Sequence, residues 1–123
     1  MNDRAGLGQA GEKHAERFLR RRLGYRIVTR NYRCPAGEID LIALDGNPVV
    51  FVEVKTRTGR EHADPQDAVN PAKQQRLLKS ARFFLRQTRS EDRPCRLDVI
   101  AITLDDDNNM NVEHIKEAFG PER

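Results

Sequence analysis

The stretch "GEIDLIALDGNPVVFVEVKTR", residues 37–57, has the pattern of two strands joined by a tight turn. Both runs are dominated by Ile, Leu, Val and Phe, which is typical of strands buried in a core. Charged residues nevertheless lie inside them, Glu38 and Asp40 in the first and Glu53 and Lys55 in the second. Ionised groups avoid a dry core unless their charge is compensated. These four residues therefore point to a functional site.

The length and composition bound the class of protein. A chain of 123 residues has the size of one domain, so we expect a single unit over residues 1–123. Cys34 and Cys95 form no C-x-x-C motif, and no zinc site is expected. No apolar segment has the length of a signal peptide or a membrane span, so we expect a reduced, cytoplasmic protein with no membrane contact.

Hydrophobic periodicity and turn residues divide the whole chain into elements. In chain order we expect a helix over 7–23, strands over 25–33, 38–44 and 49–57, a loop over 58–69, a helix opened by Asn70 and Pro71, and strands over 95–104 and 110–115. The order α-β-β-β-α-β-β predicts an α/β sandwich with a mixed five-stranded sheet flanked by helices. The strands on either side of the second helix should pair in parallel, which makes strand 49–57 central.

Alternation along the strands predicts where the charges meet. Glu53 and Lys55 share one face of their strand, and Glu38 and Asp40 share a face with Ile42 in theirs. An antiparallel hairpin sets the start of one strand beside the end of the other. We therefore expect Asp40 to lie near Glu53 and Lys55.

The energetics of such a cluster narrow the choice of occupant. Two carboxylates about 4 Å apart repel by roughly 4 kcal/mol at an effective dielectric near 20, and desolvation costs several kcal/mol more. One lysine cannot offset both effects, whereas Mg²⁺ or Mn²⁺ can, because hard cations favour carboxylate oxygens. Two alternatives remain: an internal ion pair, Glu53 with Lys55 or Asp40 with an arginine, and a carboxylate kept neutral by a raised pKa.

An acid followed by a tight hairpin and E-x-K resembles the core of the PD-(D/E)xK nuclease superfamily, here Asp40, Glu53 and Lys55. Ile39 replaces the proline of the motif, which leaves the acid in place. The segments "GQAGEKHAERFL", "AVNPAKQQRL" and "RLDVIAI" extend the likeness over most of the chain. Together they resemble the YraN family of small bacterial proteins, similar in fold to archaeal Holliday-junction resolvases and restriction endonucleases. The resemblance thus implies a restriction-endonuclease-like sandwich.

The resemblance also implies roles for single residues. Asp40, Glu53 and the backbone carbonyl of Val54 would hold Mg²⁺ or Mn²⁺, and Lys55 would orient a water or stabilise developing charge. Glu12 in the first helix would complete the site. Its sequence context agrees, because Glu16 has Arg20 four residues on, whereas Glu12 has no local cation. Glu38 is either an outer member of the site or the partner of an arginine.

Basic residues cluster in two places. Residues 17–33 contain seven arginines and no acid, and the polar face of the second helix repeats Arg or Lys every three or four residues. Both are either solvated faces or surfaces for a polyanion such as DNA. The residues that we expect to contact phosphates are Arg20, Arg30, Arg57, Lys73 and Gln74. Arg96 and Asp98 lie in an apolar strand and are expected to form a structural ion pair.

The leading hypothesis is a metal-dependent endonuclease acting on DNA, including branched or otherwise structured DNA. The alternative is a nucleic-acid-binding or partner-recruiting module whose nuclease site is weak or silent. A third option is an unrelated fold whose strand charges pair internally without metal. Resolvases work as symmetric dimers, so a homodimer is expected by analogy alone.

Overall fold

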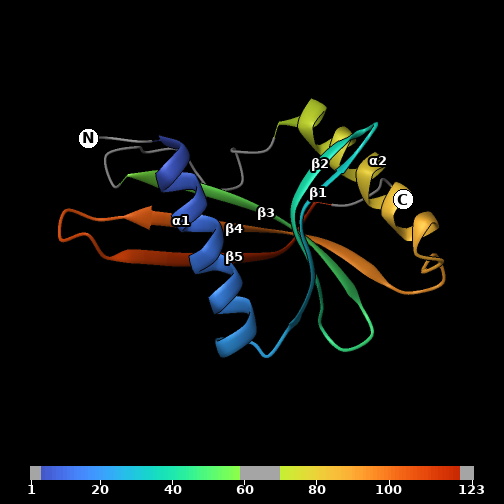
Figure 1. The fold of residues 1–123 in the computed structure, drawn as a ribbon, viewed down its shortest axis with the longest axis horizontal. Coiled ribbons are helices and arrows are strands. Elements are labelled where there is room, and N and C mark those ends of the chain that lie inside the picture. The colour runs from blue at the N-terminus through green and yellow to red at the C-terminus, as the bar shows by residue number, and fades with distance from the viewer. Residues whose placement is uncertain (1–3, 59–69, 120–123) are drawn as a thin grey trace.

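The computed structural model describes residues 4–58 and 70–119 (Figure 1). Its elements are α1 (Arg4–Arg17), η1 (Phe18–Arg22), β1 (Arg26–Cys34), β2 (Gly37–Leu44), β3 (Val49–Thr58), α2 (Pro71–Gln87), β4 (Cys95–Leu104) and β5 (Met110–Phe119). The predicted element order and the α/β class are confirmed. Most of the predicted loop, residues 59–69, lies outside the described residues. None of the described helices is long and apolar enough to cross a bilayer.

The five strands form one mixed sheet in the order β1-β2-β3-β4-β5. β3 and β4 run parallel on either side of α2 in the chain, and the other neighbours are antiparallel. The parallel pairing is continuous from Val49 opposite Cys95 to Thr58 opposite Leu104. β3 is therefore central, as the sequence predicted.

The sheet splits between β2 and β3. Their pairing extends only from Leu44 opposite Val49 to Leu41 opposite Val52. Beyond that point the start of β2 pairs only with β1, and the end of β3 pairs only with β4. In Figure 1 the β1–β2 hairpin swings toward α2 while β3, β4 and β5 continue beside α1. The two strands thus part next to Asp40 and Glu53.

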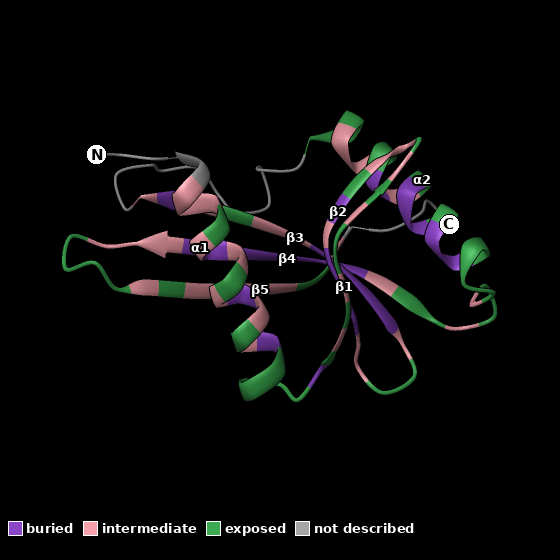
Figure 2. Ribbon diagram, in the orientation of Figure 1, coloured by how far each residue is buried: buried purple, intermediate pink, exposed green. Residues whose placement is uncertain are grey.

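The two helices cover opposite faces of the sheet. Phe51 packs with Leu77 and Phe84 of α2, and Val52 packs with Leu19 in the other core. The buried positions of α2 recur at three- and four-residue steps, which gives it one apolar side (Figure 2). A central strand buried on both sides explains the nearly continuous apolar run that opens β3.

Two element ends differ from the prediction. The first helix begins at Arg4 and finishes in a wider π-helical turn over Phe18–Arg22, before Gly24 at φ +73°. β5 continues to Phe119, four residues beyond the predicted end. It does so through an irregularity opposite Leu97–Val99, where Glu117 has φ +49° and donates its N–H to Asp98. Neither feature has a local signal in the sequence.

The charges of β4 form a buried polar network. Asp98 is 1% exposed and accepts from Arg96 Nε at 3.1 Å, from the N–H of Glu117 at 3.1 Å and contacts His114 Nε2 at 2.7 Å. Arg96 also pairs with Asp45 at 3.0 Å. The structural ion pair predicted for Arg96 and Asp98 is confirmed, and His114 is a member that the sequence did not indicate.

Candidate active site

The split between β2 and β3 opens into a cavity of about 760 Å³. Its walls come from α1, β2, β3 and α2: Leu7, Gly8, Glu12, Glu38, Asp40, Glu53, Val54, Lys55, Thr56, Arg57, Thr58 and Lys73. The cavity therefore gathers the strand charges, the first-helix glutamate and two of the predicted phosphate-binding residues. A core that closed over these groups would have left no room for an ion.

The split also fixes the carboxylate of Asp40. The backbone N–H of Val54 donates to Asp40 Oδ2 at 2.8 Å, at the level where the β2–β3 ladder has ended. Strict alternation is interrupted beside Asp40, since Ile39 and Ile42 pack in the same core. Asn31, in β1 at the same level, has φ +50°, a conformation that asparagine tolerates. The side chain of Asp40 thus takes a backbone donor that would otherwise lack a strand partner.

Glu53 lines the same cavity as Asp40 and is largely buried, with 11% of its side chain exposed. Burial, a hydrogen bond with Asp40 and the charge of Asp40 together raise the pKa of Glu53 to about 8. Lys73 Nζ lies 3.1 Å from Glu53 Oε2 and lowers that pKa in part. Without a further cation, Glu53 is therefore mostly protonated at neutral pH.

The lysine that lies beside Glu53 is not the one considered from the sequence. Glu53 pairs with Lys73 of α2 and not with Lys55, its neighbour on β3. Asn70 caps α2 by accepting from the N–H of Lys73, which places this lysine in the first turn of the helix, over the sheet. Lys73 therefore reaches the cavity from the start of α2.

Close packing of α1 against β3 positions Glu12. A Cβ on Gly11 would lie 2.0 Å from Thr56 Oγ1, so only glycine allows the helix to approach this near. Glu12 then lines the cavity, where burial, followed by the charges of Asp40 and Glu38, raises its pKa. Thr56 is a contact that the sequence analysis missed, although a glycine inside an amphipathic helix was its signal.

The remaining predicted residues divide into two groups. Lys55 is exposed at the cavity wall, and Arg57 is buried there at 4% exposure. Glu38 is at the rim, largely exposed, with Arg33 at 3.5 Å, which fits the arginine-partner alternative. Gln74 is half-buried on α2 and does not line the cavity.

Arg20 and Arg30 are not brought into the cavity. Both pair with Glu16 of α1, Arg30 through two hydrogen bonds and Arg20 at 3.8 Å. Charge balance accounts for this, because the carboxylate of Glu16 contacts both guanidinium groups. The separation of Glu16, which has cations, from Glu12, which has none in a described ion pair, agrees with the sequence analysis.

The donor set fits a hard divalent cation. Asp40, Glu53 and Glu12 offer carboxylate oxygens, and Val54 offers its carbonyl. Burial, and then the charges of neighbouring acids, raise the pKa values of Glu12 and Glu53, and a bound cation would offset both effects. Within residues 4–58 and 70–119, however, no three Asp, Glu, His or Cys side chains are already grouped as ligands. A cation would thus rest on few protein ligands and keep several waters, as Mg²⁺ does.

Comparison with known proteins places these residues in a family. A model of the family described as "Uncharacterised protein family UPF0102" matches residues 11–102. A UPF0102 protein of Symbiobacterium thermophilum is 48% identical over 113 residues, covering 92% of this chain and 95% of that protein. A second, from Geotalea daltonii, is 48% identical over 118 residues, with coverage of 96% and 92%.

A solved structure described as "The structure of Pyrococcus Furiosus SfsA in complex with Ca2+" is also similar. The TM-score is 0.43 with 17% sequence identity, over 93% of this chain and 64% of that chain. A likeness this distant decides nothing about the chemistry of the cavity.

Proposed function

This chain belongs to the uncharacterised protein family UPF0102, and we propose that it is a metal-dependent endonuclease that hydrolyses phosphodiester bonds in DNA. One observation carries the proposal. Asp40 and Glu53, from two strands that part, lie together on the wall of a cavity that lysine and arginine also line. This reaction needs paired carboxylates to bind a cation and positively charged side chains to bind a phosphate.

The residues divide the work by position. Asp40, Glu53, the carbonyl of Val54 and Glu12 would hold Mg²⁺ or Mn²⁺, which supplies an acidified water and neutralises phosphate charge. The N–H of Val54 keeps the carboxylate of Asp40 oriented. Lys55, exposed at the wall, stabilises charge on the phosphate, and Lys73 balances the charge of Glu53.

The proposal includes the wider setting expected from the sequence. Arg57 and Lys73 would contact the phosphates nearest the cavity, whereas Arg20 and Arg30 could reach only phosphates farther along the strand. Gln74, in the first turns of α2 and half-buried, would contact the backbone from its side. A cytoplasmic location and a homodimer belong to the same proposal.

A second candidate, a nucleic-acid-binding module with a silent site, has one observation in its favour. Lys73 Nζ lies 3.1 Å from Glu53 Oε2 and so competes for an oxygen that a cation would use. If Lys73 remains in contact with Glu53 after metal is added, the cavity can bind a phosphate without cleaving it.

One experiment separates the two candidates. Mg²⁺ and then Mn²⁺ are titrated into wild type and Asp40→Asn by calorimetry, and both proteins are incubated with linear, flapped and four-way DNA. We expect metal binding and cleavage by wild type, with cleavage at least about a hundredfold slower in Asp40→Asn. Glu113→Gln, an exposed acid on β5, is the matched control and should keep the wild-type rate.

The other outcomes are equally informative. DNA binding without cleavage of any substrate would support the silent module. If wild type shows no heat of metal binding, Lys73 permanently occupies Glu53 and the charged cavity serves no metal chemistry.

A further inference from the structure

The outward side of α2 carries cations and an exposed aromatic ring that the candidate active site does not use. We call this surface the α2 strip, and it consists of Arg76, Lys79, Arg82, Phe83 and Arg86. All five are exposed, Phe83 to 38%, and they follow one another on the side of the helix away from the sheet (Figure 2). Among the described residues, none of the four cations has a side-chain hydrogen bond or ion pair.

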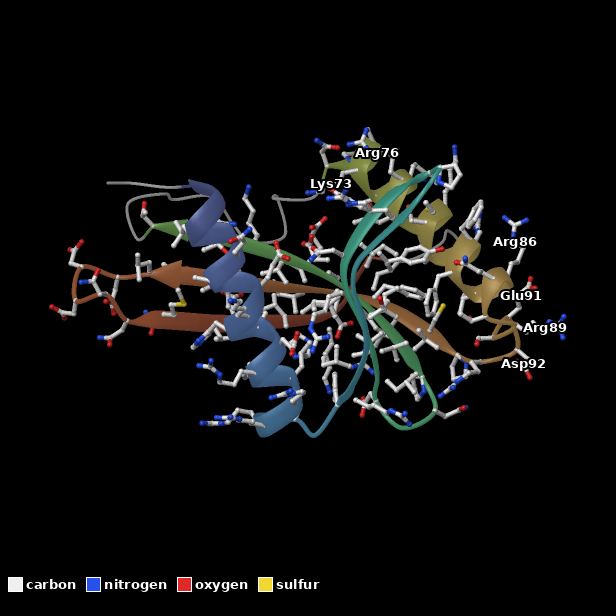
Figure 3. The ribbon with its side chains drawn as sticks, viewed as in Figure 1. Lys73, Arg76, Arg86, Arg89, Glu91 and Asp92 are labelled. Atoms are coloured by element: carbon white, nitrogen blue, oxygen red, sulfur yellow. The ribbon has the colours of Figure 1, made fainter. Side chains whose placement is uncertain are left out.

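The strip begins at the candidate active site. Lys73, which pairs with Glu53, is one turn before Arg76 on α2. A second hollow of about 530 Å³ lies between the β1–β2 hairpin and α2, and it shares Glu38 and Lys73 with the first cavity. Arg33 and Arg76 line this second hollow. Figure 3 shows Lys73 and Arg76 at one end of α2 and Arg86 at the other.

The physical chemistry of the strip selects a partner. Like charges three and four residues apart repel in the free helix, so the arrangement favours a bound polyanion. From Lys73 to Arg86 the helix rises by about 20 Å, enough for several phosphates of one strand. A solvent-exposed phenylalanine among cations can stack on a base, and bases are open to stacking only where they are unpaired. An acidic protein would use the charges but would leave the ring without this role.

We propose that the α2 strip binds a single-stranded segment of nucleic acid, with phosphates on its cations and one unpaired base stacked on Phe83. This inference rests on the proposed function, because it defines the substrate as DNA with a single-stranded flank leading away from the cavity. The duplex part of the substrate enters at the cavity, and the flank follows α2 toward its C-terminal end.

The first test measures the charges, in EDTA so that no cleavage can occur. Binding of a fluorescent 12-nucleotide single strand is followed by anisotropy across salt concentrations for wild type and for Lys79→Gln/Arg82→Gln/Arg86→Gln. Each lost phosphate contact lowers the salt slope by about 0.7 for single strands, so we expect a decrease of about 2. Lys116→Gln, an exposed cation on β5, is the control and should leave the slope unchanged. Equal slopes for wild type and the triple variant would overturn the proposal.

The second test isolates the ring. Phe83→Leu keeps an apolar side chain and loses stacking, whereas Phe83→Tyr keeps both. We expect single-strand affinity to fall at least about fivefold in Phe83→Leu and to stay near wild type in Phe83→Tyr. Blunt duplex should bind the three proteins equally. Equal single-strand affinity of the two variants, or poly-glutamate competing as well as the oligonucleotide, would overturn the proposal.

Thermal melts check the variants, whose side chains are all exposed, for intact folding. The outcome for the strip is separable from that for the nuclease. Stacking and salt effects in EDTA, without cleavage in Mg²⁺, would support the strip and reject the enzyme. Cleavage in Mg²⁺ with unchanged binding by all strip variants would reject the strip and support the enzyme.

Discussion

At Glu53, burial and the neighbouring Asp40 make the protonated acid the favoured form up to a pKa of about 8. In the unfolded chain the same acid titrates near pH 4.5. Between these values the folded protein binds more protons than the unfolded chain, so its stability falls as the pH rises. Without metal, Glu53 therefore destabilises the fold progressively from about pH 5 to pH 8.

The substitution Glu53→Gln should remove this dependence. We expect the free energy of unfolding of metal-free wild type to decrease by on the order of 2 kcal/mol more than that of the variant over this pH range. Urea denaturation at pH 5, 6, 7 and 8 measures the difference. Glu38→Gln, at the exposed rim of the same cavity, should follow wild type. Parallel curves for wild type and Glu53→Gln would show that Glu53 is ionised in the fold.

Among the elements, α1 is positioned by one glycine. Gly11→Ala places a methyl group 2.0 Å from Thr56 Oγ1, so the helix must move away from β3. We expect a loss of about 1–3 kcal/mol in the free energy of unfolding, although alanine is the better helix former. Gly8→Ala on the same helix meets nothing within 4 Å and should gain up to about 1 kcal/mol. Chemical denaturation of both variants at one pH is the measurement, and equal effects would refute the close contact.

The sequence predicted the elements because their signals are local. The apolar run after a tight turn identified β3, and the N-cap Asn70 with Pro71 identified the start of α2, as the structure confirms. The meeting of Asp40 with β3 was also predictable, since a tight hairpin fixes the register. The extension of β5 was not, because the bulge at Glu117 depends on Asp98 in another strand.

Pairings between elements were predicted less well, for a physical reason. Two lysines could pair with Glu53. Lys55 is close to it in sequence, on the same strand, and Lys73 is close to it only in the folded protein. The position of α2 over the sheet decides that Lys73 makes the contact. Local charge predicts that Arg20 and Arg30 contact phosphate. Both instead pair with Glu16, Arg20 from four residues further along the chain and Arg30 from β1. Periodicity predicts which face of a helix or strand a residue lies on. It does not predict which of several oppositely charged side chains will pair with that residue.

In the whole molecule, the two polar clusters inside the sheet differ in how far their charges are satisfied. At the split, burial and then the charges of neighbouring acids raise the pKa values of Glu12 and Glu53, so their ionised forms are not fully compensated. Around Asp98, burial alone would raise the pKa, but hydrogen bonds from His114 and Glu117 and the charge of Arg96 lower it overall. The acids at the split are therefore suited to bind a cation, and the network around Asp98 holds β4 and β5 together.

This difference predicts opposite outcomes for two similar substitutions. Asp98→Asn removes one of the two carboxylates that pair with the largely buried Arg96 and should lower the free energy of unfolding by about 3–5 kcal/mol, while the folded variant still binds Mg²⁺. Asp40→Asn should abolish Mg²⁺ binding with a much smaller loss of stability.

The pKa of Asp98 is lowered in the fold, so the stabilisation that its carboxylate provides is present above pH 3.8 and is lost as the pH falls further. Asp98→Asn should therefore lack this loss of stability at acid pH. Denaturation from pH 2 to pH 7 and metal calorimetry on both variants decide the matter, and an Asp98→Asn protein as stable as wild type would show that the network does not hold the sheet together.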